Sequence, residues 1–159
     1  MEVWRKYGKH AVSNTGIAIG PRKQAESVDP RGYIHFKGPN GKNCKVHRAV
    51  AELFVHNPRP DIFNQVDHID RNTSNNHWRN LRWTNNRLNK LNSGKGCSQR
   101  TSGRWEARAW DGIKNRYLGT YTTPWEASKV SKSVQKEVFG NLYQELTGIT
   151  VGWSPFYDR

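Results

Sequence analysis

The stretch VDHIDRNTSNNHWRNLRW (residues 66–83) sets an acid beside a histidine in an apolar frame and follows them with a run of amides. Val66–Ile69 favours a β-strand, and the polar segment after it is typical of a loop. NLRW (80–83) favours a second strand. Thr84 is expected to cap a short helix over residues 85–92, because a threonine side chain can accept from the free amides of a helix start. The stretch therefore predicts a small ββα unit.

The segment before this unit predicts a hairpin followed by a helix. Residues 32–47 form two short alternating runs around Pro39-Asn40-Gly41, which is a turn sequence. The next helix has apolar residues on one face and prolines beyond its end: Val50, Leu53, Phe54, Pro58 and Pro60. His47 stands at the junction of hairpin and helix, where we expect a local hydrogen-bonding group rather than a catalyst.

The segment after residue 92 predicts a further unit. Residues 93–103 are rich in glycine and serine, as hinges are. Alternation over residues 104–110 predicts a strand with two different faces. We expect Trp105, Ala107 and Ala109 on one face, and Glu106, Arg108 and Trp110 on the other. Asp111-Gly112 predicts a turn, and NRYLGTY (115–121) predicts a second strand.

A long helix should follow these strands. Thr123, Pro124 and Glu126 match an N-cap, a first-turn proline and a capping box. The apolar positions recur at helical spacing and stop at a glycine: Ala127, Val130, Val134, Val138 and Gly140. We expect core packing for Trp105, Leu118 and Trp125.

These elements predict an α+β fold in three parts. Residues 1–92 would hold the hairpin-helix module and the ββα unit. Residues 93–146 would form an antiparallel sheet packed on one helix. Residues 147–159 would form a C-terminal tail. A low apolar share, 34% of the chain, favours two small cores over one large one.

The charge of the chain predicts a polyanionic partner. Lys and Arg total 26 against 13 acidic residues, a formal charge of +13. The segment from Arg71 to Trp105 contains eight basic residues and no acid. With seven Trp and six Tyr interleaved, this composition favours nucleic acid over a merely soluble basic surface.

The cysteine content and the hydropathy of the chain argue against a disulfide-rich protein, a structural zinc site and a membrane protein. Cys44 and Cys97 cannot supply a disulfide framework and suit a reducing compartment. Cys44 and His47 have half the spacing of a zinc site, but no second pair follows, so we expect no structural zinc. No stretch approaches the ~18–20 apolar residues that span a bilayer, and the first residues lack a signal core. We expect no membrane partner and a cytoplasmic location.

Asp67 and His68 are the candidates for chemistry. Asp67 offers a hard oxygen ligand suited to Mg²⁺ or Mn²⁺, to which Asn89 could add an amide oxygen. His68 can accept a proton from water. Because adjacent side chains in a strand face opposite ways, a bulge, the strand end or a long reach must bring both to one site. Asn80 is expected to tie the loop together by hydrogen bonds.

The order of these residues resembles the HNH endonucleases, whose site is a ββα-metal unit. DHID, then Asn80 twelve positions after His68, then Asn89 nine positions later carry the resemblance. The phage and intron homing branch is matched best, through HRAVAELFVHNP (47–58) and VSNTG (12–16) followed by a hairpin. The resemblance covers about residues 4–92, and VSNTG with the hairpin is similar to the small nuclease-associated module of that branch.

The resemblance implies a role for each matching residue. Asp67 would bind the metal, His68 would be the general base, Asn80 would fix the loop, and Asn89 would be the second metal ligand. The commonest pattern has histidine at that last position, so the neighbouring asparagines remain alternatives: Asn85, Asn86 and Asn92. Asp70 and His77 are expected to be loop scaffold.

Residues 96–146 resemble the plant Apetala/ethylene-response-factor DNA-binding domains. GCSQRTSGRWEARAW, NRYLGTY and TPWEASKV carry this resemblance. It implies a three-stranded antiparallel sheet that enters the DNA major groove and is backed by a helix. The DNA-contact candidates on this unit are Arg100, Arg108, Trp110, Arg116 and Tyr117. Phosphate contacts are expected from the basic segment before it: Arg79, Arg82, Arg87 and Lys95.

The sequence thus predicts a metal-dependent endonuclease of homing type acting on double-stranded DNA. One site in each chain predicts a monomer that nicks one strand and leaves 5′-phosphate and 3′-hydroxyl ends, with a dimer as the alternative. A non-catalytic DNA-binding protein or repressor is the rival function. RNA binding comes third, because no aromatic-rich RNA-recognition signature is present. If the gene belongs to a phage, the protein would work in the cytoplasm of the host.

Overall fold

The chain divides into two units between Asn85 and Asn86. The computed structural model describes residues 1–21, 27–93 and 96–149. The mixed α+β class predicted from the sequence is confirmed. The division falls seven residues before the boundary expected after Asn92, because the short helix that follows Asn85 is counted with the second unit. Most of the expected C-terminal tail lies outside the described residues.

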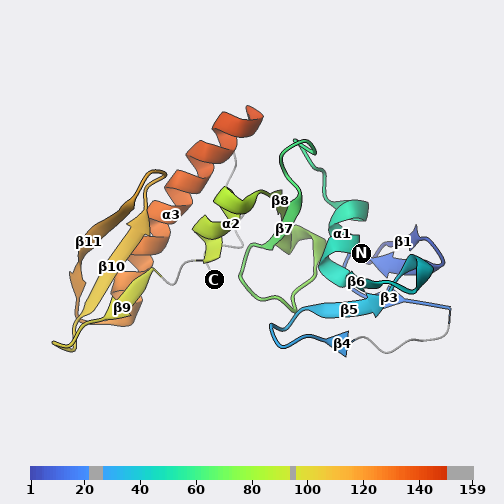
Figure 1. Cartoon of the computed structure of the whole chain (residues 1–159), viewed down its shortest axis with the longest axis horizontal. Helices are drawn as coiled ribbons and strands as arrows, with labels where there is room; N and C mark the ends of the chain where they lie inside the picture. Colours follow the sequence, from blue (N-terminus) through green and yellow to red (C-terminus); the bar gives the residue numbers. More distant parts are fainter. Residues whose placement is uncertain (22–26, 94–95, 150–159) are drawn as a thin grey trace. The chain divides into compact units, whose positions relative to one another are not determined.

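The first unit begins with a small antiparallel sheet (Figure 1, blue). Its strands lie in the order β1-β2-β3: β1 (Trp4–Tyr7), β2 (His10–Ser13) and β3 (Ala18–Ile19). The turn between β2 and β3 is built by the VSNTG motif, in which Gly16 has φ +99°. That value lies in the region that favours glycine, so the motif contains glycine for a backbone reason.

The predicted hairpin and helix come next and are confirmed. The hairpin gains a third strand from upstream, so the order is β4-β5-β6. The elements are β4 (Ser27–Val28), β5 (Ile34–Lys37), a 3-10 turn (Pro39–Gly41), β6 (Asn43–Lys45) and α1 (Val46–Phe54). One hydrophobic core joins these modules: Val12, Ala18, Phe36, Val46, Ala49, Val50 and Leu81 are all buried, with Leu53 and Phe54 packed against them.

The opening stretch forms a two-stranded ladder. Its elements are β7 (Gln65–His68), a 3-10 turn (Trp78–Asn80) and β8 (Leu81–Thr84), with a loop between. Asp67 pairs with Arg82 and His68 pairs with Leu81 in an antiparallel register. The prediction of Thr84 as a helix cap is wrong. Thr84 is fully buried as the last residue of β8, and α2 (Asn86–Ser93) begins two residues later.

The second unit is a three-stranded antiparallel sheet with helices. Its sheet order is β11-β10-β9, and α2 and the sheet both pack on α3. The elements are β9 (Cys97–Gln99), β10 (Trp105–Trp110), β11 (Asn115–Tyr121) and α3 (Pro124–Thr147). The expected faces of β10 are present: Ala107 and Ala109 are buried while Arg108 is exposed. The sheet approaches α3 closely, since a Cβ on Gly96 would lie 2.6 Å from the Cβ of Ser131.

The start of α3 is confirmed, whereas its predicted end is wrong. Thr123 and Glu126 form a reciprocal capping box with Pro124 in the first turn. The helix passes through Gly140 and ends at Gly148, whose φ is +69° and whose amide donates to Gln144 O at 2.7 Å. An interior glycine costs only about 1 kcal/mol. The apolar side chains beyond it offset this cost by being buried.

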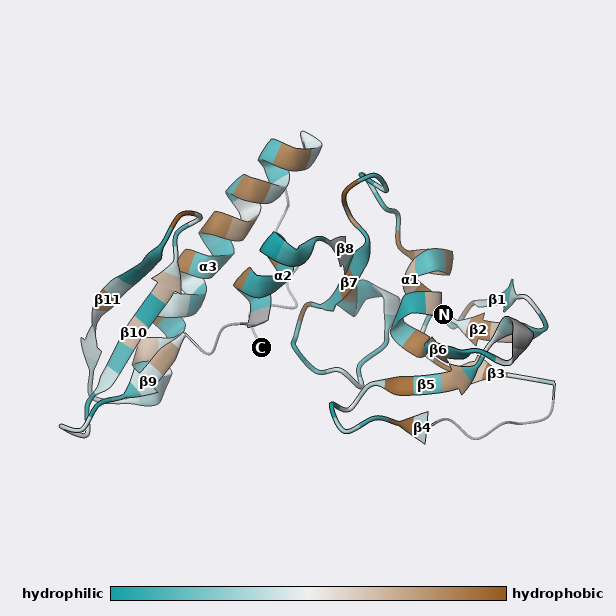
Figure 2. Ribbon diagram, in the orientation of Figure 1, coloured by the Kyte–Doolittle hydropathy of each residue, from teal (hydrophilic) through white to brown (hydrophobic). Residues whose placement is uncertain are grey.

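The buried face of α3 also differs from the predicted one. Figure 2 shows apolar and polar bands alternating along this helix. The fully buried positions are Ala127, Ser131, Gln135, Phe139 and Leu142, whereas Val130, Val134 and Val138 flank them and are partly buried. The prediction that Trp125 packs in the core is wrong as well, since its side chain is 68% exposed. Trp125 lies about 200° around the helix from Ala127, which faces the sheet. Trp105 and Leu118 are partly buried.

Among the residues described, no helix combines the length and the apolar character needed to cross a bilayer.

Replacing Thr123 by Ala should lower the free energy of unfolding of the second unit by about 1 kcal/mol, because the amide of Glu126 loses its capping acceptor. Urea denaturation followed by circular dichroism measures this. Ser133→Ala, an exposed change in the middle of the same helix, is the control. Equal midpoints for the two variants would contradict the capping role.

Candidate functional site

Asp67 and His68 lie on opposite faces of a regular strand. The register of β7 with β8 runs from Gln65 to His68 without a shift, and the amide of Ile69 continues the ladder to Asn80 O at 2.8 Å. The bulge that would bring both side chains to one face is therefore not present. Both side chains are buried, with 7% of Asp67 and 4% of His68 exposed. A site using both must place its substrate at the end of the strand.

The ring of His68 lies against the core side of the ladder. Its Nε2 is 3.0 Å from Asn76 Oδ1, a hydrogen bond between two buried side chains. The His47 ring meets it edge-on, with 4.9 Å between ring centroids, and the Tyr33 ring lies at 5.9 Å. Segments far apart in the sequence therefore enclose one imidazole.

His47 is more than a junction residue. It lies in the first turn of α1 and is 6% exposed, and its Nδ1 is buried without a hydrogen-bond partner. Burial lowers the pKa of His47 to about 3, and nearby positive charge from His68 and Lys45 acts in the same direction. His47 is therefore a neutral ring that forms one wall around His68.

A network of amides holds the loop between β7 and β8. Asn80 Oδ1 accepts from the amide of Asp70 at 3.1 Å, and Asn80 Nδ2 donates to Asp70 Oδ1 at 2.9 Å and to Asn75 O at 2.8 Å. Asn75 Nδ2 donates to Asp70 Oδ2 at 2.7 Å. Burial raises the pKa of Asp70, but the hydrogen bonds from Asn75, the Asn72 amide and Asn80 outweigh burial, and the net pKa is lowered. This carboxylate is part of the loop scaffold.

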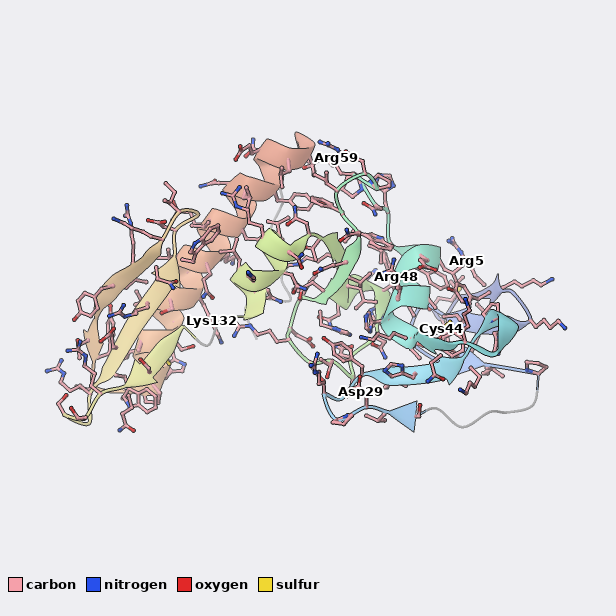
Figure 3. All side chains as sticks on the ribbon, in the orientation of Figure 1. Arg5, Asp29, Cys44, Arg48, Arg59 and Lys132 are labelled. Atoms are coloured by element: carbon pink, nitrogen blue, oxygen red, sulfur yellow. The ribbon has the colours of Figure 1, made fainter. Side chains whose placement is uncertain are left out.

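The same loop is attached to the turn that carries Tyr33. Asp29 (labelled in Figure 3) accepts from the amides of Arg31 at 2.9 Å and Tyr33 at 3.0 Å. Thr73 Oγ1 donates to Arg31 O at 2.9 Å, and Ser74 Oγ donates to Gly32 O at 3.1 Å. The turn at residues 29–33 and the loop after His68 therefore form one rigid wall of the site.

The VSNTG turn closes the opposite side of the loop. The amide of Trp78 donates to Asn14 O at 2.9 Å. A Cβ on Gly16 would lie 2.6 Å from the Cβ of Asn76 and 2.9 Å from its carbonyl carbon. Only a glycine allows this approach, so the N-terminal sheet is packed directly on the residue that bonds His68.

Asp67 is the candidate metal ligand, and it is ion-paired. Arg82 donates to Asp67 Oδ2 from Nε at 3.0 Å and from Nη2 at 2.7 Å. The Arg82 side chain is 15% exposed, so this predicted phosphate contact points inward instead. Asn89 lies on α2 and belongs to the second unit. Within residues 1–21, 27–93 and 96–149, no three His, Cys, Asp or Glu side chains gather as a metal site.

The predicted DNA contacts fall into two groups, apart from Lys95, which lies outside the described residues. Arg79 is exposed on the first unit, with its guanidinium 5.4 Å from the Trp78 ring. Arg87 belongs to the second unit, where it donates to Gly112 O at 3.1 Å and lies over the Trp110 ring at 5.4 Å. Arg87 therefore supports the β10–β11 turn.

A buried glutamate organises the arginines of the second unit. Glu106 is 5% exposed and pairs with Arg100 at 2.5 Å and with Arg108, whose side chains are 54% and 56% exposed. The pKa of Glu106 is lowered by its hydrogen bonds from Arg108 and Arg100. Asp111 pairs with Arg116 at 2.5 Å. Tyr117 is exposed beside these pairs, with its hydroxyl bonded to Thr120 at 2.6 Å.

Sequence reasoning missed Asn76, Tyr33 and Gly16 as parts of the site. Asn72, Asn75 and Asn76 look alike in the sequence, and the structure shows that Asn76 bonds His68. The signal that could have identified Gly16 was present in VSNTG, because a glycine after two turn-forming residues indicates a positive φ.

His47 should stay neutral in the folded protein far below the pH at which histidine ordinarily protonates. In the unfolded chain the His47 ring binds a proton below about pH 6.5. The contribution of the buried neutral ring to the free energy of unfolding is therefore fully present above that pH, and it is lost as the pH falls toward 3. At pH ~5 the loss is about 2 kcal/mol. Urea denaturation above about pH 6.5 and at pH ~5 measures this loss of stability. His47→Gln should remove this part of the pH dependence. An unchanged dependence in that variant would contradict the assignment.

Comparisons with known proteins bear on about half of the chain. No protein-family model matches the chain. It is 37% identical over 91 residues to the DNA endonuclease I-HmuI of Bacillus phage SP01, covering 54% of this chain and 51% of that protein. It is 35% identical over 94 residues to the HNH endonuclease L245 of Acanthamoeba polyphaga mimivirus, covering 54% and 28%.

A third relative, from the SPbeta prophage of Bacillus subtilis (strain 168), is named as an HNH homing endonuclease. It is 36% identical over 93 residues, covering 53% of this chain and 51% of that protein. A solved structure of I-HmuI matches with 33% identity and a TM-score of 0.49, covering 57% of this chain and 56% of that one. The chain spans about half the length of two of these curated relatives and less of the third. Over about half its own length it is similar to HNH homing endonucleases, which supports a nuclease.

Proposed function

We propose that this protein is a metal-dependent DNA endonuclease of homing type. The observation that carries the proposal is the end of β7, where a buried imidazole and a buried carboxylate occupy adjacent positions on opposite faces. A phosphate at that strand end would lie between a base and a charged ligand. The relatives named as a DNA endonuclease and as an HNH homing endonuclease support the same activity.

His68 acts as the general base in this proposal. Its imidazole takes a proton from a water molecule, and the water oxygen attacks phosphorus in line with the 3′-oxygen. The bond from phosphorus to the 3′-oxygen breaks, which leaves a 5′-phosphate and a 3′-hydroxyl. The walls formed by His47, Tyr33 and Asn76 keep the ring in place, and such placement supplies much of the rate in a reaction of this kind.

The chemical types of the proposed ligands fit a hard divalent ion. Mg²⁺ and Mn²⁺ take few protein ligands and complete their shells with water and phosphate oxygens, so one carboxylate and one amide suffice. Asp67 would supply the carboxylate, and Asn89 would supply the amide. When bound, the ion neutralises charge on the phosphate oxygens. Asn80 takes no part in the chemistry and holds the loop that carries Asn76.

DNA binding is assigned to both units. The exposed arginines of the second unit, Arg100, Arg108 and Arg116, lie on or next to the sheet that carries Trp110 and Tyr117, and their exposure supports an Apetala-like reader. A guanidinium on these exposed side chains could reach a base edge or a phosphate. On the first unit, Arg79 is placed to contact the phosphate backbone.

One site in each chain makes the monomer a nicking enzyme, which acts in the cytoplasm of its host if a phage encodes it. A long-lived open circle from supercoiled plasmid is the product expected. Direct conversion to linear DNA would refute nicking by a monomer and favour a dimer.

The rival is a DNA-binding protein without activity. One observation favours it: Arg82 forms an ion pair with Asp67 and so neutralises the candidate metal ligand. The rival predicts tight binding and no cleavage with either metal.

Replacing His68 by Ala should abolish cleavage and leave DNA affinity within about twofold, because general-base catalysis contributes about 10²–10⁴ in rate and little binding. A pool of supercoiled plasmids carrying phage and bacterial DNA, incubated with Mg²⁺ or Mn²⁺, measures the nicks, and a chelator should stop them in the wild type. His56→Ala, an exposed histidine of the same unit, is the control. A nicking His68→Ala protein would end the proposal.

Replacing Arg108 by Ala should weaken DNA binding by about 1–3 kcal/mol if its guanidinium reads a base, or reduce the salt slope by about one if it meets a phosphate. Fluorescence anisotropy at several salt concentrations separates the two. Arg59→Ala removes an equally charged residue that pairs with Asp61 on the first unit, and it should leave binding unchanged. Equal effects in both variants would show a loss of net charge only.

A further inference from the structure

We propose that Glu106 is the positioning residue for two DNA-reading arginines of the second unit: its carboxylate holds the Nε atoms of Arg100 and Arg108, so that the outer edges of both guanidinium groups are presented to the bases of a duplex. The proposal rests on the DNA binding proposed above for this unit. It gives a role to an acidic residue on a surface that is otherwise expected to attract phosphates.

Glu106 lies at the centre of one face of the sheet. β10 is the middle strand (Figure 1), and Glu106 on it pairs with Ser98 of β9 and with Thr120 of β11. Arg108 shares this face, because side chains two positions apart along a strand point the same way. The acid is therefore flanked by strands on both sides, with an arginine next to it on its own strand.

The carboxylate of Glu106 is shielded from solvent, whereas its two partners are not. Its side chain is 7% exposed, and those of Arg100 and Arg108 are 54% and 56% exposed. A buried carboxylate is costly unless its oxygens are bonded. Here both oxygens are bonded: Arg100 Nε donates to Oε2 at 2.5 Å, and Arg108 Nε donates to Oε1. One acid therefore fixes two arginines at the same atom of each.

The two arginines keep most of their donors for a ligand. A guanidinium has five N–H groups, of which one is on Nε. Within the part of the chain that the structure describes, the bonds to Glu106 use Nε, and the Nη atoms of both arginines have no partner. The Nη edge can donate two parallel hydrogen bonds, and the O6 and N7 acceptors of guanine match this geometry in the major groove. Both arginines therefore suit a guanine edge.

Pairing before binding lowers the entropic cost of reading a base. An arginine that moves freely in solvent loses rotamer freedom when it docks on DNA. Arg100 and Arg108 are already tethered at Nε in the protein without DNA. Because one carboxylate tethers both, the positions of the two guanidinium groups depend on a single side chain. Loss of Glu106 should therefore release both arginines at once.

The sign of the effect separates positioning from simple charge. A negative charge on a surface that contacts only phosphates repels the DNA, so its removal should raise the affinity for every duplex. If Glu106 positions the arginines, its removal should instead lower the affinity for a preferred sequence. Affinity for other sequences should still rise, because that part of binding depends on net charge.

The first experiment identifies the bases that the two arginines read. The full chain, in a chelator that removes divalent metal, selects duplexes by binding from a random-sequence DNA library. Arg100→Ala and Arg108→Ala are carried through the same selection. We expect the wild type to prefer guanine at defined positions, and each variant to lose that preference at some of them. A wild type without preference, or unchanged preferences in both variants, would overturn the proposal.

The second experiment replaces Glu106 by Gln, which has a similar size but only one side-chain oxygen. That oxygen can accept from one Nε, whereas the NH₂ group beside it cannot accept from the other. The affinity for the selected duplex, relative to a scrambled duplex of equal length, should fall about tenfold, which is within the discrimination that a bidentate contact supplies. The guanine positions affected should be those that depend on Arg100 or Arg108. Fluorescence anisotropy measures both affinities.

Two further variants control for charge and for folding. Glu137→Gln removes the same charge from an exposed position of α3, so it should raise both affinities alike and leave their ratio unchanged. Glu106→Asp keeps the charge but shortens the side chain, so it should lose the discrimination without gaining affinity for the scrambled duplex. Thermal melting by circular dichroism confirms which Glu106 variants are folded. A wild-type ratio in either folded Glu106 variant would overturn the proposal.

These measurements do not depend on cleavage, because they are made without metal. A wild type that nicks no DNA with Mg²⁺ or Mn²⁺ refutes the nuclease function, while the selected sequences and the affinity ratios still decide the role of Glu106.

Discussion

The amide of Asn80 is the constraint on which the first unit depends. Its two polar atoms make three hydrogen bonds across the loop between β7 and β8, to the amide and carboxylate of Asp70 and to the carbonyl of Asn75. Asp70 then holds Asn75, and the closed loop presents Asn76 to His68. A long polar segment would otherwise retain much conformational freedom. Here it becomes a rigid support, because hydrogen bonds join it to itself and to the turn at residues 29–33.

This rigidity is shared with parts of the chain that carry no chemistry. The loop is bonded to the turn at residues 29–33, and the VSNTG turn packs on its other side. The N-terminal sheets and the β7–β8 ladder also share one hydrophobic core. The hairpin-helix module is therefore part of the site, since it supplies His47 and Tyr33 as walls. Removing it would expose the imidazole and release the loop.

In the second unit a buried carboxylate balances the positive charge of exposed arginines. Glu106 is buried beneath two exposed arginines, so each positive side chain is paired on one side and open to solvent on the other. Alternation along β10 predicted which residues share this face, and the capping box predicted where α3 begins. The end of the helix could not be predicted from Gly140. A helix continues through a glycine when later side chains are buried, and burial is a property of the assembled unit.

The sequence by itself determined the elements and the candidate residues. The spacing of apolar residues and the capping residues act over a few positions. They were therefore enough to predict the strand at Asp67 and His68, the polar loop, the hairpin and the start of α3. Only the tertiary structure decided what surrounds His68. Asn76, His47, Tyr33 and Gly16 come from segments up to 60 residues apart in the sequence. They meet because one core and a few long-range hydrogen bonds bring these segments together, and no local pattern records such contacts.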